Sequence, residues 1–186
     1  MREFGSSSIS LAGSLLIAHP SLLDPNFRKG VIFLSAHDAE EGSFGIMLNR
    51  PAGRTVSEVL PGKELGPLGA VPLCLGGPVA TDQLIFADFR WNADEKRFDC
   101  RHHLGLEEAQ ESAEIDPHGI RAFVGYAGWS KGQLEAELAQ HAWLVKRPER
   151  DLLNPQRSPT LWRDVLKSFG PWFQLVGEAP ENPSLN

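Results

Sequence analysis

Short apolar runs separated by turn residues recur along this 186-residue chain and predict a β-rich core. The runs are rich in β-branched and aromatic residues, which favour strands. Five of them are predicted strands: Val31–Ser35, Phe44–Leu48, Val71–Leu75, Leu84–Phe89 and Ile120–Ala127. Pro51 is expected to stop the second. Phe98, Cys100 and His102 occupy alternate positions of a further segment and indicate an edge strand.

Helices are indicated by capping sequences. Thr55 and Glu58 have the spacing of a capping box, in which the hydroxyl accepts from the amide of the third helical residue and the carboxylate accepts from the cap amide. A short helix to about Leu60 should follow. Ser130 and Gln133 have the same spacing and predict a second capped helix. A weaker helical pattern covers residues 106–113.

The clearest helix lies near the C-terminus. Ser158 is its expected cap and Pro159 its first residue. Gly170 and Pro171 are expected to end it, because a proline cannot continue a helix. Its apolar stripe comprises Leu161, Trp162, Val165, Leu166 and Phe169.

Strands and helices alternate irregularly, which favours an α+β fold with a mixed sheet over a regular βα repeat. A chain of this length buries about 70% of its unfolded surface in one core. We therefore predict a single domain at residues 11–176, a flexible N-terminus at 1–10 and a disordered tail at 177–186.

Composition restricts location and partners. Two cysteines, Cys74 and Cys100, are too few for a disulfide framework and lack zinc-site spacing, so we expect free thiols in a reducing compartment. The N-terminal residues resemble neither a signal peptide nor a membrane span, which predicts a cytoplasmic protein without membrane contact. A net charge of -6 with scattered basic residues disfavours direct binding to nucleic acid.

The segment 128–132 reads Gly-Trp-Ser-Lys-Gly and matches the nucleophile elbow of serine hydrolases. The elbow needs a histidine later in the chain, and His141 is the only one. It lies on the same predicted helix as Ser130, about 16 Å away at 1.5 Å per residue, which is beyond hydrogen-bond reach. We therefore favour a capping role for Ser130, although a histidine from earlier in the chain remains an alternative.

The same turn also imitates a phosphate-binding loop, but Gly132 rather than Ser or Thr follows Lys131, so the Mg²⁺-binding hydroxyl is missing. The free amides of a helix N-terminus still attract anions. His102 and His103 are adjacent, and in a regular strand they point to opposite faces, so they are not expected to chelate one metal. We predict no metal and no cofactor.

Several sequence blocks resemble, in order, those of the YqgE/AlgH family over roughly residues 13–176. Blocks in a fixed order are far more specific than any one motif. They are 16–20 (Leu-Ile-Ala-His-Pro), 24–28 (Asp-Pro-Asn-Phe-Arg), 45–51 (Gly-Ile-Met-Leu-Asn-Arg-Pro), 75–79 (Leu-Gly-Gly-Pro-Val), 125–129 (Gly-Tyr-Ala-Gly-Trp), 131–135 (Lys-Gly-Gln-Leu-Glu) and 142–144 (Ala-Trp-Leu).

This resemblance implies a branched, partly barrel-like mixed β-sheet surrounded by helices. It implies no activity, because the family is largely uncharacterised and its description as a transcriptional regulator of alginate production comes from one branch. Many relatives carry a cysteine at the end of the first core strand, where this chain has Ser35. A thiol-based redox role proposed for the family is therefore not expected of this protein.

The polar and turn residues of these blocks are the candidate ligand-binding residues. A cleft that they line would suit a small anionic ligand. Each also has a structural alternative, such as capping, turn formation or core packing, which we favour for most of them. The candidates are His19, Asp24, Arg28, Asn49, Gly76, Gly77, Trp129 and Lys131.

Three classes of function follow, in order of preference. The first is a non-catalytic binding or regulatory protein that acts through a small anionic ligand or a protein partner, because no acid, base and nucleophile can be assembled. The second is an enzyme with an unrecognised, hydrolase-like site. The third is a transcriptional regulator acting directly on DNA, although the sequence has no helix-turn-helix pattern and no basic recognition helix.

Overall fold

A computed structural model describes residues 10–38, 40–152, 154 and 158–179. In that part of the chain nine strands form one sheet, with five α-helices and one 3-10 helix around it. The strands are β1 (Leu15–Ala18), β2 (Val31–Asp38), β3 (Gly42–Met47), β4 (Pro51–Thr55), β5 (Pro72–Leu75), β6 (Val79–Asn92), β7 (Arg97–Leu104), β8 (Ile120–Trp129) and β9 (Trp143–Lys146). The helices are α1 (Val56–Val59), η1 (Gly66–Ala70, 3-10), α2 (Leu106–Ile115), α3 (Gln133–Ala139), α4 (Leu161–Lys167) and α5 (Pro171–Glu178).

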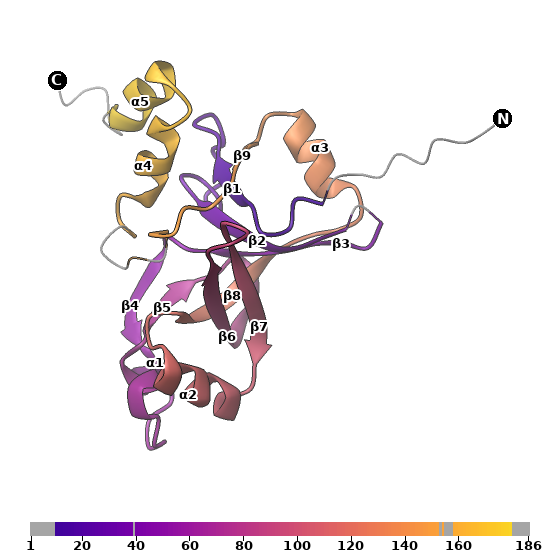
Figure 1. Cartoon of the computed structure of the whole chain (residues 1–186). Coiled ribbons are helices and arrows are strands. Elements are labelled where there is room, and N and C mark those ends of the chain that lie inside the picture. Colours follow the sequence, from indigo (N-terminus) through magenta and orange to yellow (C-terminus); the bar gives the residue numbers. More distant parts are fainter. Residues whose placement is uncertain (1–9, 39, 153, 155–157, 180–186) are drawn as a thin grey trace.

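The sheet is mixed and branched (Figure 1). Its main path runs β4-β5-β8-β3-β2-β1-β9, and β6 leaves this path with β7 because β6 also pairs with β8. The β5–β8 ladder is parallel and the others are antiparallel. The long strand β8 makes the branch: residues 122–124 pair with both β5 and β6, and residues 127–129 pair with β3. This curled half-barrel confirms the predicted α+β class.

Glycines allow two chain segments to cross at this branch. A Cβ on Gly76 would lie 2.2 Å from the carbonyl oxygen of Gly125, and one on Gly77 would lie 2.2 Å from the carbonyl of Tyr126. Gly125 also has a φ of 69°, which side chains rarely allow. The turn 76–77 therefore packs directly on the backbone of β8, and a larger residue would push the two apart.

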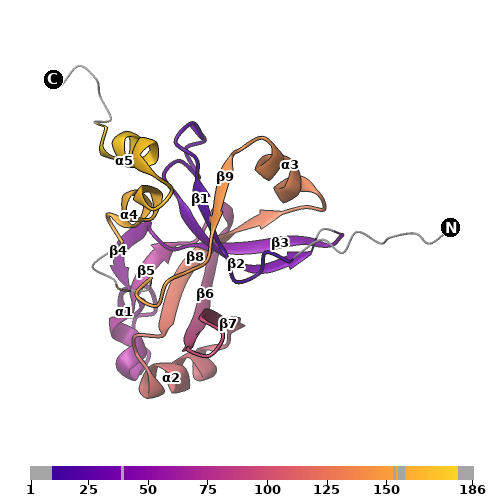
Figure 2. The same ribbon diagram turned by 45° about the horizontal axis from the view of Figure 1, so that its top comes forward.

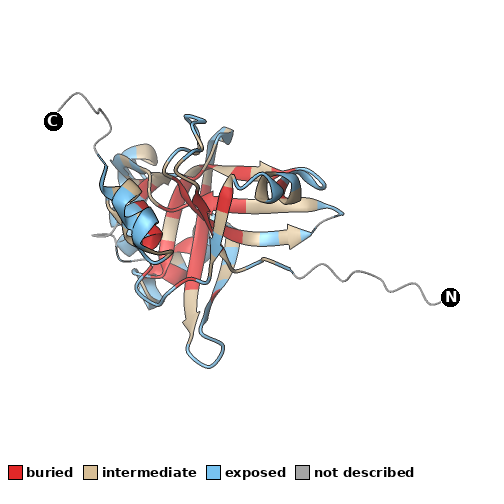
Figure 3. Ribbon diagram, turned by 90° about the horizontal axis from the view of Figure 1, so that it is seen from above, coloured by how far each residue is buried: buried red, intermediate tan, exposed pale blue. Residues whose placement is uncertain are grey.

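Two apolar clusters hold the fold together. The larger joins β1, β2 and β3 to parts of β6 and β8 and to α4, while the smaller lies between η1, α2 and the beginnings of β5 and β8. Figure 2 shows α1 and α2 at one end of the molecule, with α4 and α5 at the other. Figure 3 shows the buried residues concentrated on the central strands.

Many predicted elements are confirmed. The five predicted strands correspond to β2, β3, β5, β6 and β8, and β7 is an edge strand whose only partner among the described strands is β6. At the start of α1, the Thr55 amide donates to Glu58 Oε2 at 2.7 Å, as the capping box requires. Both cysteines are free.

The prediction at Pro51 was incomplete. The strand before it ends at Met47, but Pro51 itself begins β4, where it lies opposite Cys74 of β5. Proline lacks an N–H to donate and is tolerated here because β4 lies at the edge of the sheet.

Ser130 does not cap α3 as predicted. Gly132, with a φ of 72°, is the N-cap, and the helix begins at Gln133. The Gln133 side chain reaches back as expected, because its Oε1 accepts from the Ser130 amide at 3.1 Å. The Ser130 hydroxyl, however, donates to the same oxygen at 3.2 Å. A left-handed glycine between the two residues moves the start of the helix along the chain.

The caps near the C-terminus were also placed wrongly. Residues 158–160 form a turn, and Thr160 rather than Ser158 precedes α4. The helix does end before Gly170 and Pro171, as expected, but Pro171 is also the first residue of a further helix, α5, which the sequence did not predict. A proline that ends one helix is equally suited to the first turn of the next. Helix α5 ends at Glu178, beyond the predicted domain boundary, and residues 180–186 of the predicted tail lie outside the described residues.

Finally, His102 and His103 do not point to opposite faces of β7. The register of the β6–β7 ladder shifts between Phe86 and Ala87, so that His103 is an extra, bulged residue with a φ of 59°. A bulge changes the direction of a side chain. The two histidine rings are consequently in contact.

Candidate functional site

The structure places His19 against the C-terminal helix. Its ring stacks on Trp172 with a centroid distance of 6.3 Å and meets the edge of Phe173 at 5.9 Å. Its Nδ1 lies 2.7 Å from the hydroxyl of Ser21. His19 therefore helps to pack α5 beside the end of β1.

Asp24, Arg28 and Asn49 organise the loop between β1 and β2. The Asp24 carboxylate accepts from the amide of Asn26 at 2.8 Å and so stabilises a turn. The side chain of Asn49 accepts from the Val31 amide at 2.8 Å and donates to a loop carbonyl at the same distance. Arg28 contributes its carbonyl oxygen, which accepts from a neighbouring guanidinium at 2.8 Å. The hydrogen bonds of all three residues therefore fix the conformation of this loop.

The other candidates lie around β8. Gly76 and Gly77 form the crossing described above. Trp129 is only 5% exposed, and its indole N–H donates to Glu137 at 2.9 Å. Lys131 is exposed and forms an ion pair with Glu40. The eight candidates are not brought together in one cavity: Gly77 borders one hollow and Trp129 another.

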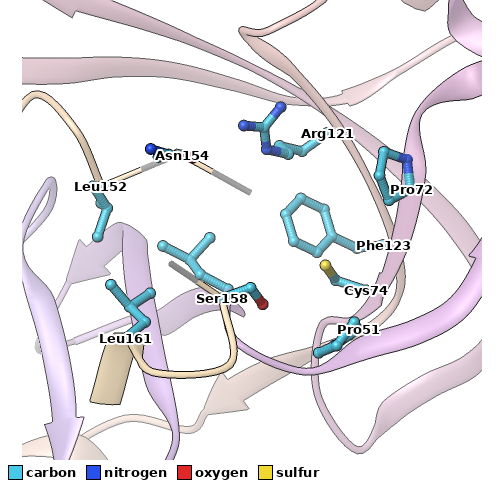
Figure 4. A pocket seen from close by; sticks show the side chains of 10 residues that line it. Pro51, Pro72, Cys74, Arg121, Phe123, Leu152, Asn154, Ser158 and Leu161 are labelled. Carbon is cyan, nitrogen blue, oxygen red and sulfur yellow. The ribbon is translucent and has the colours of Figure 1, made fainter. Parts of the chain in front are cut away.

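A different cavity stands out because it is apolar and comparatively closed. We call it the β5–β8 pocket, and its volume is about 170 Å³. Figure 4 shows the side chains that line it. They are Leu48, Pro51, Pro72, Cys74, Arg121, Phe123, Leu152, Asn154, Ser158 and Leu161.

Strand pairing explains why these side chains meet. In the parallel ladder Cys74 lies beside Phe123, and side chains two residues apart on a strand share a face. Pro72 and Cys74 of β5 and Arg121 and Phe123 of β8 therefore form one wall. Facing it, the opposite wall carries Leu152, Asn154, Ser158 and Leu161 (Figure 4).

Arg121 supplies the positive charge of the pocket. Its Nη1 donates to the carbonyl oxygens of His118 and Ile120, at 2.7 and 2.9 Å, which orients the guanidinium. Burial lowers the pKa of Arg121, and the neighbouring Asp116 and Cys74 oppose this effect. The guanidinium pKa is so high that Arg121 nevertheless stays charged at neutral pH.

Cys74 and Ser158 supply neutral polar groups. Burial raises the pKa of the Cys74 thiol and the charge of Arg121 opposes the shift, so the thiol is protonated at neutral pH. The Ser158 hydroxyl is buried and has no hydrogen-bond partner among the described residues. A buried hydroxyl of this kind can bond to a ligand in the pocket.

A larger and more open hollow, which we call the neighbouring groove, adjoins the pocket. Arg121 and Asn154 line both. The groove also presents the aromatic side chain of Trp91 and the charged side chains of Arg150 and Asp151. A ligand with its apolar part in the pocket would therefore extend past Arg121 into a polar region.

The comparisons with known proteins come from sequence and from structure. The family model described as AlgH-like matches residues 15–174 of the chain. The chain belongs to the AlgH-like family. This confirms the resemblance identified from the sequence blocks.

Relatives within the AlgH-like family match over almost their whole length. A UPF0301 protein from Streptomyces coelicolor is 37% identical, covering 95% of this chain and 96% of its own. One from Chlorobium phaeobacteroides is 33% identical, covering 94% and 95%. The crystal structure of a Corynebacterium diphtheriae protein has a TM-score of 0.70 at 25% identity, covering 90% of this chain and 92% of that one. The solution structure of the AlgH protein from Pseudomonas aeruginosa has a TM-score of 0.68 at 26% identity, covering 98% and 100%.

These similarities establish family and fold without assigning a reaction or a ligand. In the part of the chain that the structure describes, no helix is long and apolar enough to span a bilayer. The β5–β8 pocket was not found from the sequence. One signal was present, because Arg121 is a charged residue within the otherwise apolar run of β8.

Proposed function

We propose that this protein is a non-catalytic binding protein that holds a small anionic ligand in the β5–β8 pocket. The observation that carries the proposal is the combination of an apolar cavity, a buried hydroxyl at Ser158 with no hydrogen-bond partner among the described residues, and a guanidinium at Arg121. An apolar pocket with a few convergent polar groups is typical of a ligand site. The ligand class is the one expected from the sequence, but the proposed binding site is the β5–β8 pocket rather than the residues of the family-like blocks.

The volume of the pocket limits the apolar part of the ligand. A cavity of about 150 Å³ lined by apolar side chains accommodates benzene, and the pocket measures about 170 Å³. An aromatic ring or a short branched chain therefore fits. A carboxylate or phosphate attached to it would lie beside Arg121, whose positive charge attracts such groups.

Binding is favoured over catalysis by the chemistry of the lining. The raised pKa of Cys74 keeps the thiol in its poorly nucleophilic, protonated form. The described lining residues include no imidazole and no carboxylate to act as a general base. At the elbow-like turn, the Ser130 hydroxyl donates to Gln133, and no described contact joins it to a histidine.

Phenylacetate and its neutral analogue phenylacetamide are matched probes of this proposal, because they share size and differ in charge. We expect phenylacetate to shift the backbone amide NMR resonances of Leu73, Cys74 and Phe123 and to raise the melting temperature with concentration. A charge-assisted hydrogen bond contributes about 1.5–3 kcal/mol, so phenylacetamide should bind at least about tenfold more weakly.

Arg121→Gln should abolish the preference for the anion, and Arg121→Lys should retain part of it. Arg97→Gln, which removes an exposed guanidinium on β7, is the matched control and should bind as the parent does. Equal affinities for the two probes, or resonance shifts confined to other regions, would contradict the proposed site. If the probes bind as expected, native mass spectrometry of protein purified from its own host would identify the natural ligand.

A further inference from the structure

The rings of His102 and His103 face each other at the end of β7. Their Nδ1 atoms are 2.6 Å apart, and the ring planes make an angle of 71°. Neighbouring residues of a regular strand point to opposite faces, so this contact depends on the bulge at His103. The bulge thus brings together two imidazole nitrogens that an ordinary strand would separate.

The backbone of His103 is strained to achieve this. Its φ of 59° is uncommon for any residue other than glycine, although histidine is among the side chains that adopt it more often. Strained conformations persist where the surrounding structure holds them, and they concentrate at functional sites.

The position of the pair is fixed by aromatic packing across the sheet. Phe44 of β3 stacks on His102 with a centroid distance of 4.6 Å and an interplanar angle of 26°. It also contacts His103 at 5.1 Å and Tyr126 of β8 at 4.9 Å. His102 is half-buried by this packing while His103 is exposed. One ring is therefore held in place, and the other is open to solvent.

We propose that His102 and His103 form a binding site for a divalent transition metal, with Cu²⁺ preferred to Zn²⁺. Imidazole nitrogens are good ligands for both ions, and Cu²⁺ binds most tightly in the general order of divalent metals. The ion would take the place of the hydrogen bond between the two rings.

The spacing of the two nitrogens decides between the metals. Each nitrogen lies about 2.0 Å from such an ion, so two of them are about 2.8 Å apart at a right angle and about 3.3 Å apart in a tetrahedron. The observed separation is 2.6 Å. A square-planar ion such as Cu²⁺ therefore requires only a small opening of the pair, whereas tetrahedral Zn²⁺ requires a larger displacement against the Phe44 stack.

Water completes the coordination. The described part of the chain contains no group of three or more metal-binding side chains. A site with two protein ligands and exchangeable water is open, which suits a reversibly bound ion rather than a buried structural one.

The test uses the full chain, without a polyhistidine tag, and electron paramagnetic resonance with Cu²⁺ added to one equivalent at neutral pH. We expect an axial spectrum whose superhyperfine splitting shows coupling to two imidazole nitrogens. His102→Phe preserves the stacking on Phe44, and His103→Asn preserves the left-handed backbone, because asparagine tolerates that conformation. Each should lose the two-nitrogen signature and weaken Cu²⁺ binding about tenfold or more.

His118→Ala is the matched control, because it removes another exposed histidine and leaves β7 unchanged. It should bind Cu²⁺ as the parent does. Failure of the parent to bind one equivalent would overturn the proposal, as would an unchanged signature in His102→Phe and His103→Asn. Tighter binding of Zn²⁺ than of Cu²⁺ in calorimetry would overturn the preference argued from the 2.6 Å spacing.

Discussion

Replacing Trp129 with alanine should be among the most destabilising single changes in this protein. The side chain is 5% exposed and belongs to the larger apolar cluster. Its ring meets the edge of Trp143 at a centroid distance of 6.1 Å, and its N–H donates to Glu137 at 2.9 Å. The change therefore removes apolar contacts, one aromatic pair and one hydrogen bond together.

The magnitude follows from the area of the ring. A buried tryptophan removes about 150–250 Å² from water, which at about 25 cal/mol per Å² corresponds to about 4–6 kcal/mol as an upper bound. The loss of the hydrogen bond adds little, because Glu137 still accepts from Trp143 at 2.7 Å and from Gln133 at 3.0 Å. We expect the free energy of unfolding to fall by about 3–5 kcal/mol.

Urea unfolding followed by circular dichroism measures this change, and a thermal melt gives a second reading. A loss of that size lowers the melting temperature by about 6–20 °C for a chain of this length. Trp129→Phe keeps most of the packing and leaves only a small cavity in place of the second ring, so it should cost about 1–2 kcal/mol.

Trp172→Ala is the matched control, since that tryptophan lies on α5 and is 56% exposed. Its loss should cost about 1 kcal/mol or less. A free energy of unfolding within about 1 kcal/mol of the parent for Trp129→Ala would refute the core assignment. The turn after β8 would then have to be examined as a binding surface.

Four further outcomes are expected. Burial alone would raise the pKa of Asp88, but its hydrogen bonds to two arginines lower it. Stability should therefore decline as pH falls below about 4, and Asp88→Asn should flatten that decline in urea titrations. Because burial raises the pKa of Cys74 and raises that of Cys100 to about 11, native protein should react slowly with a thiol reagent and unfolded protein should react fully at both. Ser130→Ala should change the free energy of unfolding by less than about 0.5 kcal/mol. A fluorophosphonate probe should label neither the parent nor this variant. Duplex DNA should bind weakly and be released by modest salt, and a sequence-specific complex at physiological salt would contradict this.

The strands were the part of the fold most accessible from the sequence. Runs such as Ile120–Ala127 are apolar, β-branched and bounded by turn residues, and this local pattern is sufficient to indicate a strand. The capping box at Thr55 was equally local, because both partners lie within one helical turn. The sequence features that determine these elements therefore lie within a few residues of each other.

Other helix boundaries depended on context that no local motif contains. Ser130 has the spacing of a cap, but Gly132 adopts a left-handed conformation and moves the helix start. Gly170 and Pro171 are compatible both with an ending and with a beginning, and only the packing of α5 near His19 shows that a helix follows. Such choices are settled by tertiary contacts rather than by propensity.

The candidate site was harder to predict for a related reason. The β5–β8 pocket combines residues of β4, β5 and β8 with Leu152, Asn154 and Ser158. The strands meet there because Cys74 pairs with Phe123 in the parallel ladder. The pairing of β5 with β8 cannot be predicted from the spacing of residues within either strand. A charged residue inside an apolar strand, Arg121, was the one local anomaly that pointed to it.

The polar residues of the family-like blocks serve chiefly to build the branched sheet. Asn49 bonds to the backbone at both ends of a turn, and Gly76, Gly77 and Gly125 permit two chain segments to cross in contact. A crossing of this kind leaves no room for side chains, so the residue types there are restricted whatever the protein binds. The lining of the pocket is not restricted in this way, because its side chains bound an open volume. Differences in ligand among proteins of this fold should therefore arise in the pocket lining, at positions such as Arg121, while the crossing stays the same.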